Sequence, residues 1–104
     1  MKFQCEGTCR FPNGLTLLAA THILKIVDHS YSTVRIEANG HWEDATDIYG
    51  LLSLSIENND AVKITAEGQD AYDVVRNIEK MLIQHEEMAT GVAGEREVQQ
   101  AVFA

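Results

Sequence analysis

The sequence predicts an α+β fold: an open-faced sandwich in which a four-stranded antiparallel sheet carries three helices on one face, in the order β-α-β-β-α-β-α. Segments with apolar residues at every second position alternate with segments whose apolar residues recur at helical spacing. Asn39-Gly40 is a strong two-residue hairpin signal and makes the pairing antiparallel. The strands keep one polar face, so that helices need to cover only one side of the sheet.

The first half of the chain supplies three strands and one helix. Residues 2–9 are expected to form the first strand and residues 16–28 an amphipathic helix. A second strand alternates through Val34, Ile36 and Ala38, and the Asn39-Gly40 turn leads into a short strand at residues 41–44. The apolar positions assigned to the helix are Leu17, Leu18, Ala20, Leu24 and Val27.

The second half completes the sheet and adds two helices. A short helix is expected at residues 47–54, with Ile48, Leu51 and Leu52 facing inward. A strand with Val62, Ile64 and Ala66 on one face ends at Gly68, and Asp70 is expected to cap the last helix. The apolar stripe of that helix contains Ala71, Val74, Val75, Ile78, Met81 and Leu82, while Arg76 and Lys80 face water.

Length and composition favour one domain followed by an extension. The chain has 104 residues, 45% of them hydrophobic, which suffices for one core. We expect a domain at residues 1–87 and a C-terminal extension at 88–104 that is loose or ordered by a partner, because Gly91 and Gly94 oppose a continuous helix. Within the extension, residues 95–103 carry Val98, Ala101 and Val102 on one side of a short helix that is marginal in water by itself.

Charge and cysteine content exclude several functions. Sixteen acidic and eight basic residues give a net charge of -8, which argues against nucleic acid or a membrane surface and favours protein partners. No signal peptide or membrane-spanning run is seen, so the expected location is the cytoplasm. Cys5 and Cys9 would lie about 13 Å apart along one strand, so that free thiols are expected, with no disulfide, metal site or cofactor.

Several segments together resemble HPr, the histidine-containing phosphocarrier of the bacterial sugar phosphotransferase system. They are "PNGL" with "AA" at 12–20, the hairpin "ANGH", "DIYGLLSLSI" at 47–56, "AVKITAEGQD" at 61–70 and the last helix. Their order and spacing match the family without evident insertions over residues 2–87. The resemblance implies the same open-faced sandwich that the periodicity predicts.

The resemblance also implies that the phosphocarrier site is vacant. The family pattern reads roughly Gly-Leu-His-Thr-Arg-Pro-Ala, where the histidine accepts a phosphoryl group from enzyme I and passes it on. Here Thr16 stands at the histidine position and Leu18 at the position of the arginine that would pair with the phosphoryl oxygens. A threonine phosphoester is not labile enough for onward transfer, so we expect no catalytic residue and no enzymatic activity.

Two interpretations of Thr16 remain open. The simpler one is a helix N-cap, whose loss to Ala would cost about 1 kcal/mol. The other is weak anion binding at the helix N-terminus or modification of the hydroxyl. His22 lies six residues further along, about 9 Å at 1.5 Å per residue, and is expected on a different face of the helix, where it cannot replace the missing histidine.

Asp47 occupies the position where some HPr proteins carry a regulatory serine, at the start of the short helix. A carboxylate would imitate a phosphoserine only partially, because it carries about one negative charge instead of nearly two. The alternative is again a helix cap, since Asp is a preferred N-cap residue.

An exposed apolar face is expected around the vacant site. Leu17, Leu18 and Ala19 replace polar, charged or rigid residues, and Tyr49 and Leu52 on the next helix extend the partner-binding face. The alternative is that Leu17 and Leu18 turn inward or are covered by residues 95–104.

These observations predict an HPr-like regulatory or protein-interaction module that has lost phosphocarrier activity. HPr-like regulatory proteins without the histidine are known, although they keep the regulatory serine that this chain lacks. The alternatives are a phosphocarrier of the phosphotransferase system that uses a non-standard residue, and a homo-oligomeric structural module built on the Leu17 and Leu18 patch.

Overall fold

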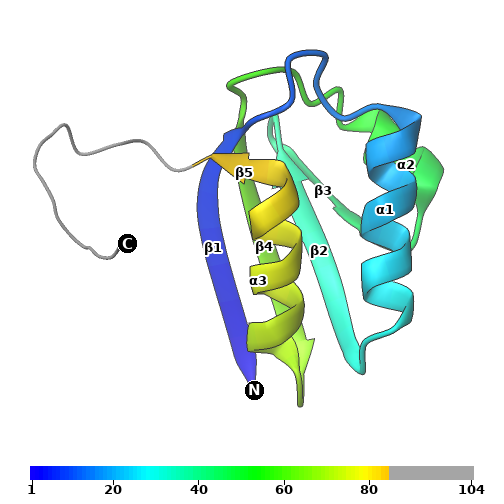
Figure 1. The fold of residues 1–104 in the computed structure, drawn as a ribbon, viewed down its shortest axis with the longest axis vertical. Coiled ribbons are helices and arrows are strands. Elements are labelled where there is room, and N and C mark those ends of the chain that lie inside the picture. Colours follow the sequence, from blue (N-terminus) through cyan, green and yellow to red (C-terminus); the bar gives the residue numbers. More distant parts are fainter. Residues whose placement is uncertain (85–104) are drawn as a thin grey trace, which may run out of the picture.

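The computed structural model describes residues 1–84, and Figure 1 shows their arrangement. The predicted order of strands and helices is confirmed, and a two-residue strand follows the last helix. The elements are β1 (Lys2–Cys9), α1 (Leu17–Asp28), β2 (Ser32–Ala38), β3 (His41–Asp44), α2 (Ile48–Ser53), β4 (Ala61–Gly68), α3 (Ala71–Leu82) and β5 (Ile83–Gln84).

The strands form one antiparallel sheet in the order β3-β2-β4-β1-β5. Cys5 on β1 lies opposite Ile64 on β4, and Ile64 in turn lies opposite Ile36 on β2, so these three side chains form a row across the sheet. The hairpin between β2 and β3 turns at Asn39 and Gly40, whose φ angles of 54° and 83° are the positive values that a tight two-residue hairpin requires. The predicted antiparallel connection is therefore confirmed.

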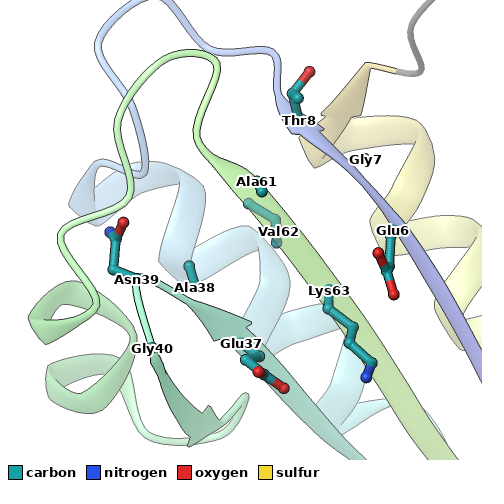
Figure 2. Close-up of a pocket in the computed structure, with 10 residues that line it drawn as sticks. All are labelled: Glu6, Gly7, Thr8, Glu37, Ala38, Asn39, Gly40, Ala61, Val62 and Lys63. Atoms are coloured by element: carbon teal, nitrogen blue, oxygen red, sulfur yellow. The ribbon is translucent and has the colours of Figure 1, made fainter.

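The helices lie on one face of the sheet, with α1 and α3 side by side in front of the strands in Figure 1. The core lies between these layers. Its largest fully buried aliphatic side chains are Ile23, Ile36, Leu51, Ile64, Ile78 and Leu82. On the other face, Glu6, Lys63 and Glu37 project from three neighbouring strands into a shallow hollow, as Figure 2 shows. One face of the sheet is thus apolar and covered, and the other remains polar.

The buried face of α1 differs from the prediction. Ala19, Ala20, Ile23 and Val27 are buried, whereas Leu17 and Leu18 keep 60% and 69% of their surface exposed. The helix turns its two small alanines toward the core, and a rotation of 100° per residue then carries the preceding leucines outward. Leu17 and Leu18 therefore lie outside the buried stripe of the helix, and the alternative in which they turn inward is wrong.

Asp70 also behaves differently from the prediction. It precedes α3, but its carboxylate makes no capping hydrogen bond to that helix. Instead it accepts a hydrogen bond from the Ser32 hydroxyl at 2.5 Å and bonds from the Tyr31 backbone N–H at 3.0 and 3.2 Å. These donors lower the pKa of Asp70 below its ordinary value, because they stabilise the charged carboxylate. Asp70 therefore ties the start of α3 to the start of β2.

The two remaining helices follow their predicted patterns with small departures. In α2, Leu51 is buried as expected, while Ile48 and Leu52 are only partly buried. In α3 the predicted stripe is buried except for the partly exposed Met81, and the stripe also includes Glu79, which pairs with Arg76 at 2.9 Å.

Three sequence-based expectations concern the domain limit with the C-terminal extension, membrane-spanning helices and a metal site. The proposed extension at residues 88–104, and the domain limit at residue 87, lie outside the described residues. Among residues 1–84, every helix is too short or too polar to cross a membrane. In that same range, no three His, Cys, Asp or Glu side chains gather closely enough to hold a metal ion.

Candidate functional site

The loop that leads into α1 is held in place by backbone hydrogen bonds. The Gly14 N–H donates to the Phe11 carbonyl at 3.0 Å, and the Leu15 N–H donates to the Ile56 carbonyl at 2.9 Å. Gly14 has a φ of +73°, and a Cβ at this position would lie 2.3 Å from the Ile56 carbonyl oxygen. Only glycine combines that backbone conformation with so close an approach. Thr16 therefore follows a fixed turn.

Thr16 is the N-cap of α1, as the simpler interpretation of the sequence predicts. Its backbone is extended, its Oγ1 accepts a hydrogen bond from the Ala19 N–H at 3.3 Å, and its carbonyl accepts from the Ala20 N–H at 2.9 Å. The hydroxyl oxygen thus satisfies one of the backbone donors that the first turn of a helix leaves unpaired.

An apolar groove lies beside Thr16 and has a volume of about 320 Å³. We call it the α1 groove. Neither Arg nor Lys is among the described residues that line it, so these residues offer no cation to pair with phosphoryl oxygens. The lining residues are Phe11, Pro12, Asn13, Gly14, Thr16, Leu18, Ala19, His22 and Met81.

His22 borders the same groove as Thr16. It lines the α1 groove together with Thr16 and Leu18, which the separation of six residues along the helix did not indicate. The reason is that Leu18 and His22 are four residues apart and share one side of α1, while Thr16 lies at the end of the helix and borders the same hollow. The four-residue spacing between Leu18 and His22 is the feature of the sequence that would have placed His22 at this groove.

Asp47 caps α2. Its Oδ1 accepts a hydrogen bond from the Gly50 N–H at 3.0 Å. A Cβ at Gly50 would lie 2.5 Å from a Glu43 carboxylate oxygen and 2.9 Å from an Asp47 carboxylate oxygen, so two carboxylates border the same turn. Asp47 therefore has a structural role in a locally acidic part of the surface.

The predicted partner-binding residues divide into exposed and half-buried side chains. Leu17 and Leu18 on α1 and Tyr49 on α2 are exposed, Tyr49 by 86%. Leu52 is partly buried and packs against the core. Ala19, which the sequence places on the same face, is buried at 8% exposure and belongs to the core. Since α1 and α2 pack against each other, the exposed side chains belong to neighbouring helices.

The two cysteines are free thiols, as predicted. Burial, reinforced by the nearby carboxylate of Glu79, raises the pKa of Cys5 to about 11. Burial also raises the pKa of Cys9. Both side chains are therefore protonated at neutral pH, which makes them poor nucleophiles and poor metal ligands.

Solved structures of HPr proteins share this fold. Phosphocarrier protein HPr from Bacillus anthracis str. Ames is 25% identical with a TM-score of 0.74, and the match covers 78% of this chain and 96% of that one. Crh, the Bacillus subtilis catabolite repression HPr, is also 25% identical with a TM-score of 0.60, covering 82% and 99%. The histidine-containing phosphocarrier protein of a Mycoplasma shares the fold at 22% identity and a TM-score of 0.73, covering 79% and 99%.

The sequence itself matches a family model described as "PTS HPr component phosphorylation site", and the match extends over residues 3–84. Apart from Lys2, the first residue of β1, this range includes every strand and helix of the described fold, together with the turn before α1 and the cap of α2. The chain therefore belongs to the HPr family of the sugar phosphotransferase system.

Proposed function

We propose that this protein is a regulatory or interaction module of the HPr family that binds protein partners and transfers no phosphoryl group. The observation that carries the proposal is the chemistry around Thr16. Its hydroxyl oxygen caps α1, and the adjacent groove is bordered by Leu18 where the family resemblance places an arginine. A phosphoryl group at this position would lack a labile phosphorus–nitrogen bond, and the described residues that line the groove would offer it no cationic partner.

The apolar side chains of α1 and α2 support the second half of the proposal. Leu17 is 60% exposed, Leu18 69% and Tyr49 86%. Large apolar side chains that gather on one surface are typical of sites for other proteins. The net charge of -8 disfavours a nucleic acid or an anionic membrane as the partner. A protein of the phosphotransferase system or a regulatory protein of the cytoplasm is therefore the proposed partner.

Asp47 fits such a module in either of its two interpretations. As a cap it stabilises α2, which carries Tyr49. Together with the nearby carboxylate of Glu43 it also gives this turn a constant negative charge, as a phosphorylated serine would do more strongly.

A specific observation favours a second candidate function, namely phosphoryl transfer by a non-standard residue. His22 is an imidazole that lines the same groove as Thr16. If it accepted a phosphoryl group, the protein would be a carrier with a displaced active site. The described residues that line the groove include no lysine or arginine. This argues against phosphoryl transfer by His22, because these residues offer no cation to pair with the charge of the phosphoryl group.

The deciding experiment incubates the parent protein with phosphoenolpyruvate and enzyme I, followed by mass spectrometry under conditions that preserve phosphohistidine. We expect no phosphoryl group on the parent and little on Thr16→His alone, since Leu18 would lie beside the new imidazole. Thr16→His with Leu18→Arg and Ala19→Pro should gain more. Phosphoryl transfer to His22, or to any residue of the parent at carrier-like rates, would overturn the proposal.

Binding through the apolar face is tested with Leu18→Arg. This substitution should weaken capture of partners from the native cell extract, or self-association measured by sedimentation equilibrium, without a loss of stability. Tyr31→Arg is the matched control, because Tyr31 is also exposed (78%) and lies beyond the other end of α1. Unchanged behaviour of Leu18→Arg in both assays would remove this face from the proposal, and self-association through Leu18 would favour the homo-oligomeric module.

A further inference from the structure

The α1 groove has the size and lining of a binding site. Its volume of about 320 Å³ falls at the lower end of the range of ligand pockets, about 300–1,000 Å³. Phe11 and Pro12 from the preceding loop, Leu18 from α1 and Met81 from α3 make most of its wall apolar. Leu18 belongs both to this groove and to the proposed partner-binding face, so an occupant of the groove would also contact that face.

The chain leaves the described fold at β5, on the edge of the sheet next to β1. Met81 lines the groove, and Gln84, the last described residue, follows only three residues later, a distance of at most about 11 Å. The end of α3 is fixed to the loop before α1, because the Arg10 N–H donates to the Leu82 carbonyl at 3.0 Å and the Arg10 guanidinium donates to the Lys80 carbonyl at 2.9 Å. Figure 1 shows the end of α3 and the start of α1 at the same end of the molecule.

The sequence beyond Gln84 contains a segment of matching chemistry. Val98, Ala101 and Val102 recur at the spacing of one helix face, with Gln99 and Gln100 between them. Residues 85–94 connect this segment to the fold and can span up to about 33 Å, which is more than the groove requires. A connection of this length gives an effective concentration on the order of millimolar. Even a contact with a millimolar dissociation constant would then be populated about half of the time.

We propose that residues 95–103 of the same chain bind in the α1 groove through Val98 and Val102, and thereby cover Leu18. The segment then competes with protein partners for the face that contains Leu18, and this consequence rests on the proposed function. The contact between the segment and the groove does not depend on that function. Binding within one chain is favoured over binding to a second copy, because two molecules that each carry a net charge of -8 repel each other.

The test uses backbone amide NMR spectra of the full chain. Val102→Asp should shift the signals of Leu18, Ala19 and His22, which line the groove, because a carboxylate opposes burial against apolar side chains. Gln100→Asp is the matched control, since it adds the same charge on the opposite side of the segment and should leave these signals in place. A synthetic peptide of residues 95–104, added to Val102→Asp, should return the groove signals toward their parent positions.

Two results would overturn the proposal. One is a spectrum in which Val102→Asp and Gln100→Asp move the groove signals equally or not at all. The other is a set of groove shifts that depends on protein concentration together with a dimer in sedimentation equilibrium, which would assign the groove to a second copy. Neither measurement involves enzyme I or a partner protein. A negative result for the groove contact would therefore not affect the non-carrier proposal. Conversely, phosphoryl transfer by the parent would not affect the proposed groove contact.

Discussion

Removal of the Thr16 hydroxyl should destabilise the protein slightly and leave its phosphoryl chemistry unchanged. The Oγ1 atom accepts one hydrogen bond, from the Ala19 N–H at 3.3 Å, which is longer than the usual range of 2.7–3.2 Å. N-cap substitutions by Ala cost about 0.5–2 kcal/mol. Since this bond is long and the side chain is exposed, we expect Thr16→Ala to lower the free energy of unfolding by about 0.5–1 kcal/mol.

The assay is urea unfolding of the parent and three variants. With a slope of about 1 kcal/mol/M for a small domain, the midpoint of Thr16→Ala should fall by about 0.5–1 M. Thr16→Ser keeps the oxygen and should retain most of the parent's stability. Thr16→Asp should be at least as stable as the parent, because a carboxylate is a good cap and the first turn of α1 contains no acidic residue that would repel it.

The stabilities of the three Thr16 variants distinguish a helix cap from a surface residue without structural effect. If Thr16→Ala and Thr16→Ser lost the same stability, the hydroxyl oxygen would not be the stabilising group. If Thr16→Ala matched the parent, the hydrogen bond to Ala19 would contribute nothing measurable. Either result would refute the assignment of Thr16 as a cap and would reopen a direct functional role for its hydroxyl.

Three further substitutions test the fold around the site. Gly14→Ala should destabilise the protein and weaken the turn before α1, because the new Cβ would approach the Ile56 carbonyl oxygen to 2.3 Å. Urea unfolding measures this loss, and parent-like stability would contradict the need for glycine. Ile78→Ala should cost about 2–5 kcal/mol in the same assay, because the side chain is fully buried between α3 and the sheet, and a loss below 1 kcal/mol would contradict that packing. The pKa of Asp70 in the folded protein lies below its unfolded value of about 3.9. The hydrogen bonds to its carboxylate therefore stabilise the fold above about pH 3.9, and this stabilisation is lost as the pH falls through the folded pKa. Asp70→Asn should therefore flatten the acid part of the stability profile between about pH 2 and 5, and a profile identical to the parent's would refute the role of this carboxylate.

The sequence determined the features that depend on neighbouring residues. Alternation and helical spacing predicted the strands and helices in order, and the Asn39-Gly40 pair predicted the hairpin with its two positive φ angles. The caps of α1 and α2 could also be predicted, because Thr16 and Asp47 bond to N–H groups only three residues away. These interactions are local, so that the residue types and their spacing are sufficient to specify them.

The tertiary structure decided everything that requires distant segments to meet. It buried Ala19 and left Leu17 exposed, because both faces of α1 contain apolar residues and only packing in the folded chain selects one. It directed Asp70 to donors at Tyr31 and Ser32 that lie 39 and 38 residues away, instead of to its own helix. The α1 groove exists for the same reason: its walls come from the loop before α1, from α1 and from α3, and only the folded chain brings these segments together.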